Sequence, residues 1–396
     1  MGILKVLLII TLLSIPTGEI ARVEVAPDIG INLIDICLSI TSAYGILYFL
    51  KNRLFNFGYE KYIFLFIIVG LFSMVINSGG FSLYQIFVSF LYPLRFLFLF
   101  MIFPLVKIQT LRFKKILGKI LIFDGIVITV LGFLQFLFYP SLRNLYYLGW
   151  DEHLYRLFST FLDPNFTGIF LVIFIFYLLS LTFPLKKEKM KINIFFVTSI
   201  ILSSVALFLT YSRGALGAFL LVSSVFIFLN KKKYILVLLM CALMVFLFQL
   251  NTVRSEGTNI LRMTSVKARI GSSFFAATII KDHPIFGVGF NSYKYVVEKY
   301  NSSKNFPINK FPSHASAPDN SFLFVLATTG MLGFVPYMLF WYKILKEKFI
   351  NFEKADNMLI IASIAVLFIS SFFVNALFYT PIMLWFLSLL GLKENK

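Results

Sequence analysis

The chain has 396 residues, of which 59% are hydrophobic and only 14% are charged. Soluble domains carry about 25% charged residues, so this composition excludes an ordinary soluble protein and indicates a membrane protein. The formal net charge of +18 fits the enrichment of lysine and arginine in cytoplasmic loops. Because the basic residues are dispersed among loops, nucleic acid is not an expected partner. The cysteines, Cys37 and Cys241, both lie in apolar stretches, so no disulfide framework is expected.

A membrane-spanning helix needs about 20 mostly apolar residues. Applied along the chain, this criterion predicts an all-α polytopic membrane protein with about twelve transmembrane helices. The first apolar run contains Lys5 near its start and resembles a signal peptide, but because many spans follow we interpret it as an uncleaved first span. The predicted spans lie near residues 3–18, 31–50, 62–77, 81–106, 116–138, 165–184, 192–210, 213–230, 234–250, 320–342, 357–376 and 379–392.

The distribution of charge predicts the orientation of these spans. If the N-terminus lies in the cytoplasm, the lysine-rich connections all fall on the cytoplasmic side, whereas the short connections on the other side hold only Arg22, Arg143, Arg156 and Arg213. Both termini are therefore expected in the cytoplasm. The long segment 251–319 is expected on the extracytoplasmic side, because long loops translocate largely regardless of their charge.

That segment divides one integral membrane domain into residues 1–250 with nine spans, the loop 251–319, and residues 320–396 with three spans. A loop of this length without structure of its own would be unusual. We predict an amphipathic helix over Thr264–Ile280, which the glycines and prolines of HPIFGVGFNS then end, and a second short helix over SYKYVVEKY. The two helices would form a small cap on the membrane domain, with apolar faces made of Phe274, Phe275, Ala277 and Ile279 in the first and of Tyr293, Val296 and Tyr300 in the second.

Several arginines of the outer side are candidate anion ligands, because a guanidinium offers a rigid fork of donors that matches phosphate oxygens. Arg213, at the start of a span, is either such a ligand or an interfacial anchor. Arg262 and Arg269, near the loop helix, are either ligands or part of a solvated basic surface. Arg156 has no structural role that the sequence predicts.

Two other charged positions have structural interpretations. Asp163 is predicted to cap the helix that begins with Pro164. Arg95 falls inside a span, where a charge is costly, and is expected to pair with Asp35 or Asp124. The histidines have no metal-ligand spacing, and neither a metal site nor a cofactor motif is expected.

Four segments taken in order resemble the O-antigen ligase and O-antigen polymerase superfamily: RLFSTFLDPN, TYSRGALGAFLL, HPIFGVGFNSY and DNSFLFVLATTGMLG. The likeness in motifs covers residues 150–335, and the order of spans extends it to the whole chain. The resemblance implies a GT-C-like membrane enzyme of the bacterial cytoplasmic (inner) membrane. It also implies metal-independent, inverting glycosyl transfer with no cofactor.

The same resemblance implies the partners and the anion site. The donor would be a glycan linked to undecaprenyl pyrophosphate in the lipid bilayer, the acceptor a second glycan, and a chain-length regulator is a further candidate partner. Arg156, Arg213 and Arg269 match the basic positions that hold the pyrophosphate in the family, and Arg262 joins them as a candidate by its place in the loop.

One departure from the family bears on the catalytic base. Many ligases carry a histidine immediately before the asparagine that opens the span after the loop, whereas this chain has Asp319 before Asn320, with His314 the nearest histidine. This favours a polymerase over a ligase. Asp319 is the first candidate for accepting the proton of the attacking hydroxyl, as carboxylates do in inverting glycosyl transfer. His314 is the second, because its ordinary pKa lies nearer neutrality, and a reaction without a dedicated base stays open. Asn320, beside Asp319, is a further candidate residue of the catalytic site.

The sequence thus predicts a polysaccharide polymerase that joins lipid-linked repeat units on the extracytoplasmic face. The first alternative is an O-antigen ligase that passes the finished glycan to lipid A core. The second is a flippase for lipid-linked oligosaccharides, although no matching pair of broken helices of the inverted-repeat type is visible.

Overall fold

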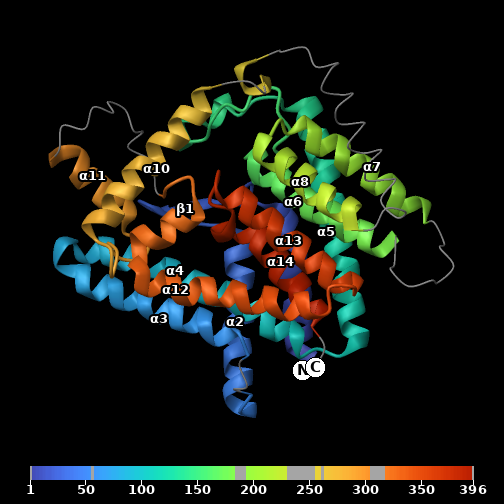
Figure 1. The fold of residues 1–396 in the computed structure, drawn as a ribbon, viewed down its shortest axis with the longest axis horizontal. Coiled ribbons are helices and arrows are strands. Elements are labelled where there is room, and N and C mark those ends of the chain that lie inside the picture. Colours follow the sequence, from blue (N-terminus) through green and yellow to red (C-terminus); the bar gives the residue numbers. More distant parts are fainter. Residues whose placement is uncertain are drawn as a thin grey trace.

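The structure, a computed structural model, describes residues 2–54, 58–182, 193–229, 255–259, 263–303 and 317–394. These residues are mostly helical (Figure 1). The elements in chain order are α1 (Gly2–Leu13), η1 (Ile15–Thr17), β1 (Val23–Ala26), β2 (Ile29–Ile31), α2 (Leu33–Asn52), α3 (Glu60–Asn77), η2 (Ser78–Gly80), α4 (Leu83–Lys107), α5 (Leu111–Phe138), η3 (Arg143–Leu148), η4 (Ser159–Phe161), α6 (Pro164–Thr182), α7 (Ile194–Leu209), α8 (Arg213–Leu229), η5 (Glu256–Thr258), α10 (Thr264–Asp282), α11 (Tyr293–Ser303), α12 (Ser321–Ile350), α13 (Ala355–Ser371), η6 (Ala376–Phe378) and α14 (Thr380–Lys393).

The long helices confirm the predicted helical membrane architecture. Within the described residues, six helices are long and apolar enough to cross a membrane: α2, α3, α4, α5, α6 and α12. The shorter apolar helices α1, α7, α8, α13 and α14 coincide with further predicted spans. The predicted span 234–250 lies outside the described residues, and the total of twelve spans stays a prediction. Two helices are longer than predicted, since α5 already begins at Leu111 and α12 continues to Ile350.

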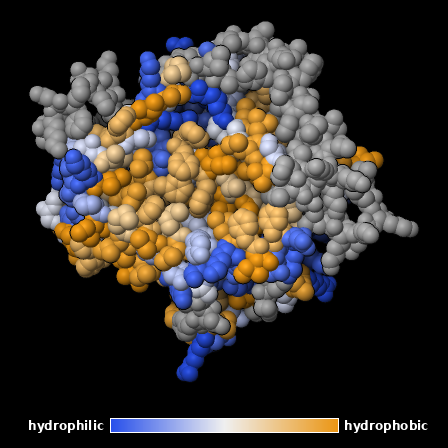
Figure 2. Space-filling view, viewed as in Figure 1, coloured by the Kyte–Doolittle hydropathy of each residue, from blue (hydrophilic) through white to orange (hydrophobic). Residues whose placement is uncertain are grey.

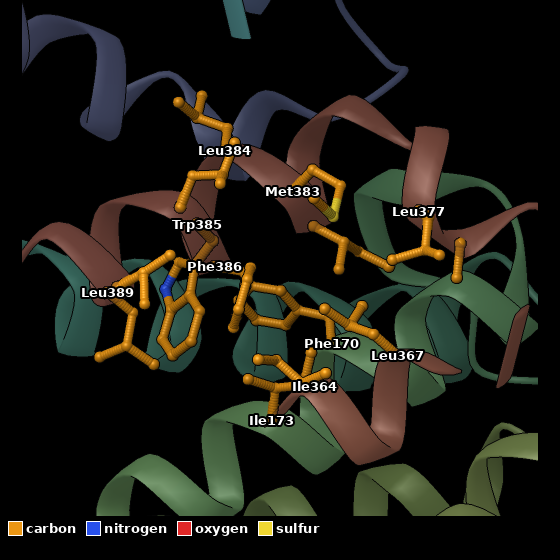
Figure 3. Packing of buried hydrophobic residues seen from close by; sticks show 14 of the residues in the cluster. Phe170, Ile173, Ile364, Leu367, Leu377, Met383, Leu384, Trp385, Phe386 and Leu389 are labelled. Carbon is orange, nitrogen blue, oxygen red and sulfur yellow. The ribbon is translucent and has the colours of Figure 1, made fainter. Parts of the chain in front are cut away.

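Helix α6 lies at the centre of the bundle, since most of its side chains, on every side of the helix, are buried against other parts of the protein. Its Phe170 packs at an edge-to-face angle on Trp385 of α14, with ring centroids 5.5 Å apart. Ile364 and Leu367 of α13 close the same cluster (Figure 3). The indole of Trp385 keeps a hydrogen bond by donating to the backbone oxygen of Leu121 in α5, at 3.2 Å. This central packing fixes α5, α6, α13 and α14 against one another.

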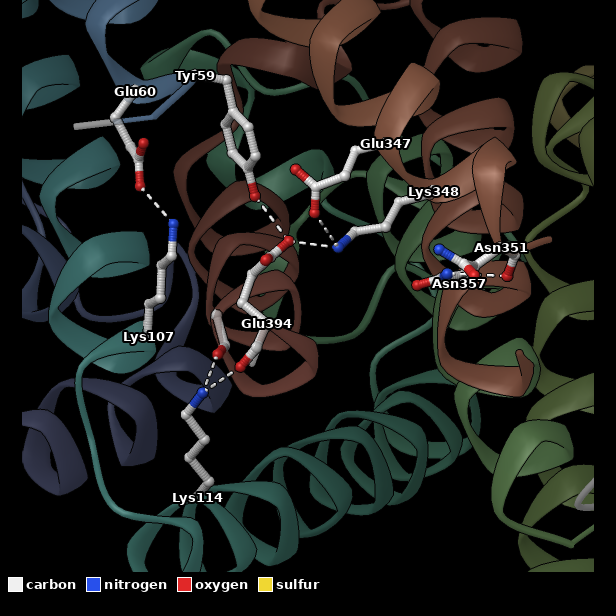
Figure 4. A network of polar contacts seen from close by, with 10 residues as sticks. Tyr59, Glu60, Lys107, Lys114, Glu347, Lys348, Asn351, Asn357 and Glu394 are labelled. Atoms are coloured by element: carbon white, nitrogen blue, oxygen red, sulfur yellow. Dashed lines mark hydrogen bonds and ion pairs between the residues drawn. The ribbon is translucent and has the colours of Figure 1, made fainter. Parts of the chain in front are cut away.

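A buried polar network ties helix ends together around the C-terminal end of α14 (Figure 4). The Tyr59 hydroxyl donates to Oε1 of Glu394 at 2.7 Å, and Lys348 forms an ion pair with the same carboxylate. Lys114 donates to the backbone oxygens of Gly391 and Glu394, at 2.9 and 2.6 Å. Lys114 and Lys348 belong to the lysine-rich connections that are predicted to lie on the cytoplasmic side. They are buried, because carboxylate and carbonyl oxygens replace their water.

The predicted pairing of Arg95 is resolved in favour of α2. Nε of Arg95 lies 2.6 Å from Oδ1 of Asp35, while Asp124 is buried in α5 away from this pair. The sequence analysis missed the antiparallel hairpin β1–β2, which pairs Val23 with Ile31 just before α2.

The loop helices form as predicted, over Thr264–Asp282 and Tyr293–Ser303, and they pack on α12. Phe275 and Ile279 of α10 join Tyr293 and Val296 of α11 in one apolar cluster that also contains Ala327 of α12. The predicted apolar face of α10 was wrong for Phe274, whose side chain is 68% exposed, and for Ala277, which lies outside this cluster. Phe274 directly precedes Phe275, and neighbouring residues on a helix point about 100° apart, so the two cannot share one narrow face.

Residues 283–292, between the two loop helices, dock into a kink of α12. Backbone N–H groups of Val288 and Gly289 donate to the oxygens of Ala327 and Thr328, at 2.9 and 3.0 Å, and Met331 donates back to Pro284 at 2.9 Å. These bonds satisfy backbone groups that the kink removes from the helical pattern. The docked segment thereby fixes α10 relative to the bundle.

The kink depends on Gly330, whose backbone angles are φ 62° and ψ −166°. A Cβ atom there would lie 2.2 Å from the backbone oxygen of Ile285. We therefore expect Gly330→Ala to lower the free energy of unfolding by about 2 kcal/mol or more, combining backbone strain with a clash against main chain. Thermal unfolding of the purified protein in detergent measures this. Gly79→Ala is the control, because a Cβ there meets no atom within 4 Å; equal melting temperatures for both variants would contradict the role given to the kink.

Candidate functional site

The predicted site residues Arg213, Arg269 and Asp319 lie close enough for their charges to interact. Burial lowers the pKa of Arg269, while the carboxylates of Asp319 and Asp163 raise it and the cation of Arg213 lowers it further. Arg269 comes from α10, Arg213 from the first position of α8, and Asp163 from the residue before α6. Segments far apart along the chain therefore bring two guanidinium groups and two carboxylates together.

Arg213 is held by the loop helix. Its Nη2 donates to Oγ of Ser265 in α10 at 2.7 Å, which joins the start of α8 to the start of α10. The neighbouring Ser212 donates to Oδ1 of Asn165 in α6 at 3.2 Å. A simple interfacial anchor would extend toward solvent, whereas this side chain is partly buried against another helix.

Arg156 has a structural role that the sequence analysis did not predict. It is 5% exposed, and its Nε donates to the backbone oxygen of Thr210 at 2.9 Å, at the corner between α7 and α8. The backbone of Leu157 donates to Leu209 at 2.9 Å, beside the same corner. Arg156 is therefore a buried residue that stabilises, through this hydrogen bond, the corner that precedes Arg213.

The backbone around this corner is strained. Five residues other than glycine adopt left-handed conformations, with φ between 46° and 56°: His153, Tyr155, Ser159, Leu162 and Tyr211. Such conformations are uncommon for residues with a Cβ atom and gather at functional sites.

A hollow of about 680 Å³ opens beside the two arginines. Arg213 and Arg269 lie in its wall, together with Ser273 of α10. The rest of the lining is mainly apolar and comes from α8, α10, α12 and α13, including Phe274, Leu323, Ile369, Phe372 and Phe373. Figure 2 shows hydrophilic residues gathered in a depression beside α10, above a broad apolar surface. The hollow therefore offers cationic groups together with a long apolar wall.

Asp319 stands just before α12, and its side chain is partly exposed and partly surrounded by other residues. Desolvation is the main cause that raises the pKa of its carboxyl group above the ordinary value; Arg269 lowers it, and Asp163 and Asp151 raise it. The backbone N–H of Asp319 donates to Oγ of Ser272 in α10 at 3.3 Å. A carboxylate with a raised pKa is a stronger base than an ordinary aspartate.

Asn320 has a structural function of its own. Its Oδ1 accepts from the backbone N–H groups of Phe322 and Leu323, at 2.9 and 3.0 Å, and so caps α12. Asp163 caps α6 as predicted, with its Oδ1 accepting from Asn165 N at 2.6 Å. Asp163 also takes part in the charge cluster, a second role that was missed although its motif was recognised.

Two predicted site residues, Arg262 and His314, lie outside the described residues. The structure adds Asp151, Asp163, Ser265 and Ser272 to the surroundings of the site. Nothing in their sequence spacing marks the two serines, because only the packing of α10 places them beside Arg213 and Asp319.

The fold and the site together define an integral membrane protein of helical architecture whose loop helix gathers cationic and acidic side chains beside an apolar hollow. Residues 198–338 match the family model described as O-antigen ligase. This match supports, over residues 198–338, the resemblance to the O-antigen ligase and polymerase family drawn from the motifs. The matched range contains Arg213, Arg269 and Asp319 and leaves Arg156 and Asp163 outside. No curated protein gave a match to the chain.

Proposed function

We propose that the protein is a polysaccharide polymerase, which joins undecaprenyl-pyrophosphate-linked repeat units on the extracytoplasmic face of the bacterial inner membrane. The observation that carries this proposal is the hollow in which Arg213 and Arg269 lie at an apolar wall, close to Asp319. A polyprenyl pyrophosphate has the same two parts, a doubly charged head and a long apolar chain. Guanidinium groups bind the head, and the aromatic and aliphatic wall accommodates the first isoprene units.

The reaction breaks the bond between the anomeric carbon of the donor glycan and the pyrophosphate oxygen, and the pyrophosphate leaves with the electron pair. Arg213 and Arg269 stabilise the negative charge that develops on this leaving group, and so bind the transition state better than the ground state. The acceptor hydroxyl attacks the anomeric carbon from the opposite face, which inverts its configuration. Asp319 accepts the hydroxyl proton as the new glycosidic bond forms. Fixed cations thus take the part that a metal ion plays in other glycosyltransferases.

A ligase that transfers glycan to lipid A core is the second candidate. The family match agrees with either activity, and Asp319 in place of the histidine of many ligases favours the polymerase. The two differ in what accumulates when the protein is lost: single repeat units for a polymerase and long lipid-linked polymer for a ligase.

Turnover in detergent tests the proposal. We expect the purified protein to convert undecaprenyl-pyrophosphate-linked repeat units into longer chains without a sealed membrane, and to do so equally in the presence of EDTA. Gel analysis of the labelled glycan follows chain length, and a preparation lacking the protein is the control. Movement of the lipid-linked unit across sealed vesicles without chain growth would instead identify a flippase.

A further inference from the structure

A second hollow, also of about 680 Å³, lies against residues 158–162. Its walls come from the segment after η1, the last turns of α5 and the η3–η4 loop. Three aromatic rings line it, those of Tyr139, Trp150 and Phe158. The polar and charged side chains of the lining are Glu19, Arg22, Glu24, Gln135 and Thr160, and leucines complete the wall.

The polar groups of this hollow retain capacity for a ligand. The Glu19 carboxylate is 8% exposed; it hydrogen-bonds with the Tyr379 hydroxyl and lies 3.7 Å from the half-exposed Arg22 guanidinium, which is longer than a close ion pair. Burial raises the pKa of Glu19, although Arg95 and Arg22 lower it. The Thr160 hydroxyl is buried and forms no hydrogen bond with any residue that the structure describes. Buried polar groups of this kind are normally satisfied, so the hollow is short of polar partners.

The wall of the hollow continues into the charge cluster of the proposed active site. Leu162 lines the hollow, and the next residue is Asp163, whose charge acts on Arg269 and Asp319. Gln135 connects the same parts, because its Oε1 accepts from Phe158 N and Ser159 N while its Nε2 donates to the backbone oxygen of Arg156 at 3.3 Å. A ligand in the hollow is thus separated from the charge cluster by one short stretch of backbone.

We propose that this hollow binds the acceptor glycan, holding the sugar whose hydroxyl attacks the donor; the inference rests on the proposed function. A sugar ring presents an apolar C–H face, which packs on Trp150 and Tyr139, and hydroxyl groups, which bond to Glu19 and Arg22. A lipid acyl chain fits less well, because it would bury a carboxylate and a guanidinium without satisfying them. The donor lipid and the acceptor sugar then approach the charge cluster from two different hollows.

Tryptophan fluorescence of the full-length protein in detergent tests this proposal. Of the three tryptophans, Trp341 and Trp385 are fully buried in the bundle, so Trp150 is the one that a ligand in this hollow contacts. The probe is the free oligosaccharide repeat released from the host strain's own surface polysaccharide. We expect a saturable change in fluorescence that Trp150→Phe abolishes and Trp341→Phe preserves. Glu19→Gln should weaken binding by about ten-fold, and Glu353→Gln, an exposed site away from the hollow, should leave it unchanged.

Two further titrations make the outcome decisive. In the first, phosphatidylglycerol in mixed micelles replaces the oligosaccharide. The proposal is overturned if only the lipid gives a saturable change in fluorescence, or if neither ligand gives one. The second uses Arg213→Ala, which should bind the oligosaccharide normally while losing affinity for undecaprenyl pyrophosphate. Normal saccharide binding without any turnover by the wild-type protein would count against the polymerase function and leave the saccharide site standing.

Discussion

Replacing Arg269 by alanine should slow polymer formation by one to two decades. The guanidinium of Arg269 lies in the wall of the apolar hollow and interacts electrostatically with Asp319, Asp163 and Arg213. If it contacts the leaving pyrophosphate, its loss removes a charge-assisted hydrogen bond worth roughly 1.5–3 kcal/mol. At about 1.4 kcal/mol per decade, this corresponds to the stated fall in rate. The measurement is the initial rate of chain growth in detergent at saturating donor.

Matched variants on the same helix separate this effect from a general loss of positive charge. Lys267 and Lys281 are exposed on α10, and their alanine variants should keep the wild-type rate. Arg269→Lys retains the charge but loses the planar fork, so its rate should fall between wild type and Arg269→Ala. The equivalent replacement Arg213→Ala should slow the reaction to a similar extent. A correctly folded Arg269→Ala protein with wild-type rate would remove this residue from the site.

The substitution Asp319→Asn should abolish most of the activity and change its pH dependence. A general base acts when deprotonated, and the raised pKa of Asp319 means that protonation begins at a higher pH than for an ordinary aspartate. The wild-type rate should therefore fall on the acid side of neutrality, as pH decreases through this raised pKa. The amide cannot accept the proton, so the variant should lose about two to four decades of rate and this acid limb together.

The pH–rate profile of kcat/KM for wild type and variants provides the measurement. Asp356→Asn removes the same charge at an exposed position paired with Lys393, distant in the fold from the loop, and should leave the profile unchanged. His314→Gln completes the comparison. If only His314→Gln abolished polymer formation, the histidine and not Asp319 would be the base.

Much of the fold was predictable because hydrophobicity alone decides which segments enter a membrane. Apolar stretches of suitable length predicted α2–α4, α6–α8, α13 and α14 to within about five residues, whereas α5 begins earlier and α12 ends later than predicted. The break at HPIFGVGFNS correctly separated α10 from α11. The hairpin β1–β2 was missed because two strands of three and four residues carry little periodic signal. The face of α10 was partly wrong, since it depends on which side of the helix meets α12.

The candidate site, like the fold, was predictable from the sequence only in part. The sequence by itself determined the chemical types, namely arginines and an aspartate gathered in one long loop and its flanking motifs, because those residues stand out against an apolar chain. Only the tertiary structure decided which of them share a place: it sets Arg213 and Arg269 in the wall of one hollow, buries Arg156 against Thr210, and brings Asp163 into the cluster. The reason is that these contacts join α6, α8 and α10 through a kinked α12, and separation along the chain carries no information about distances between helices.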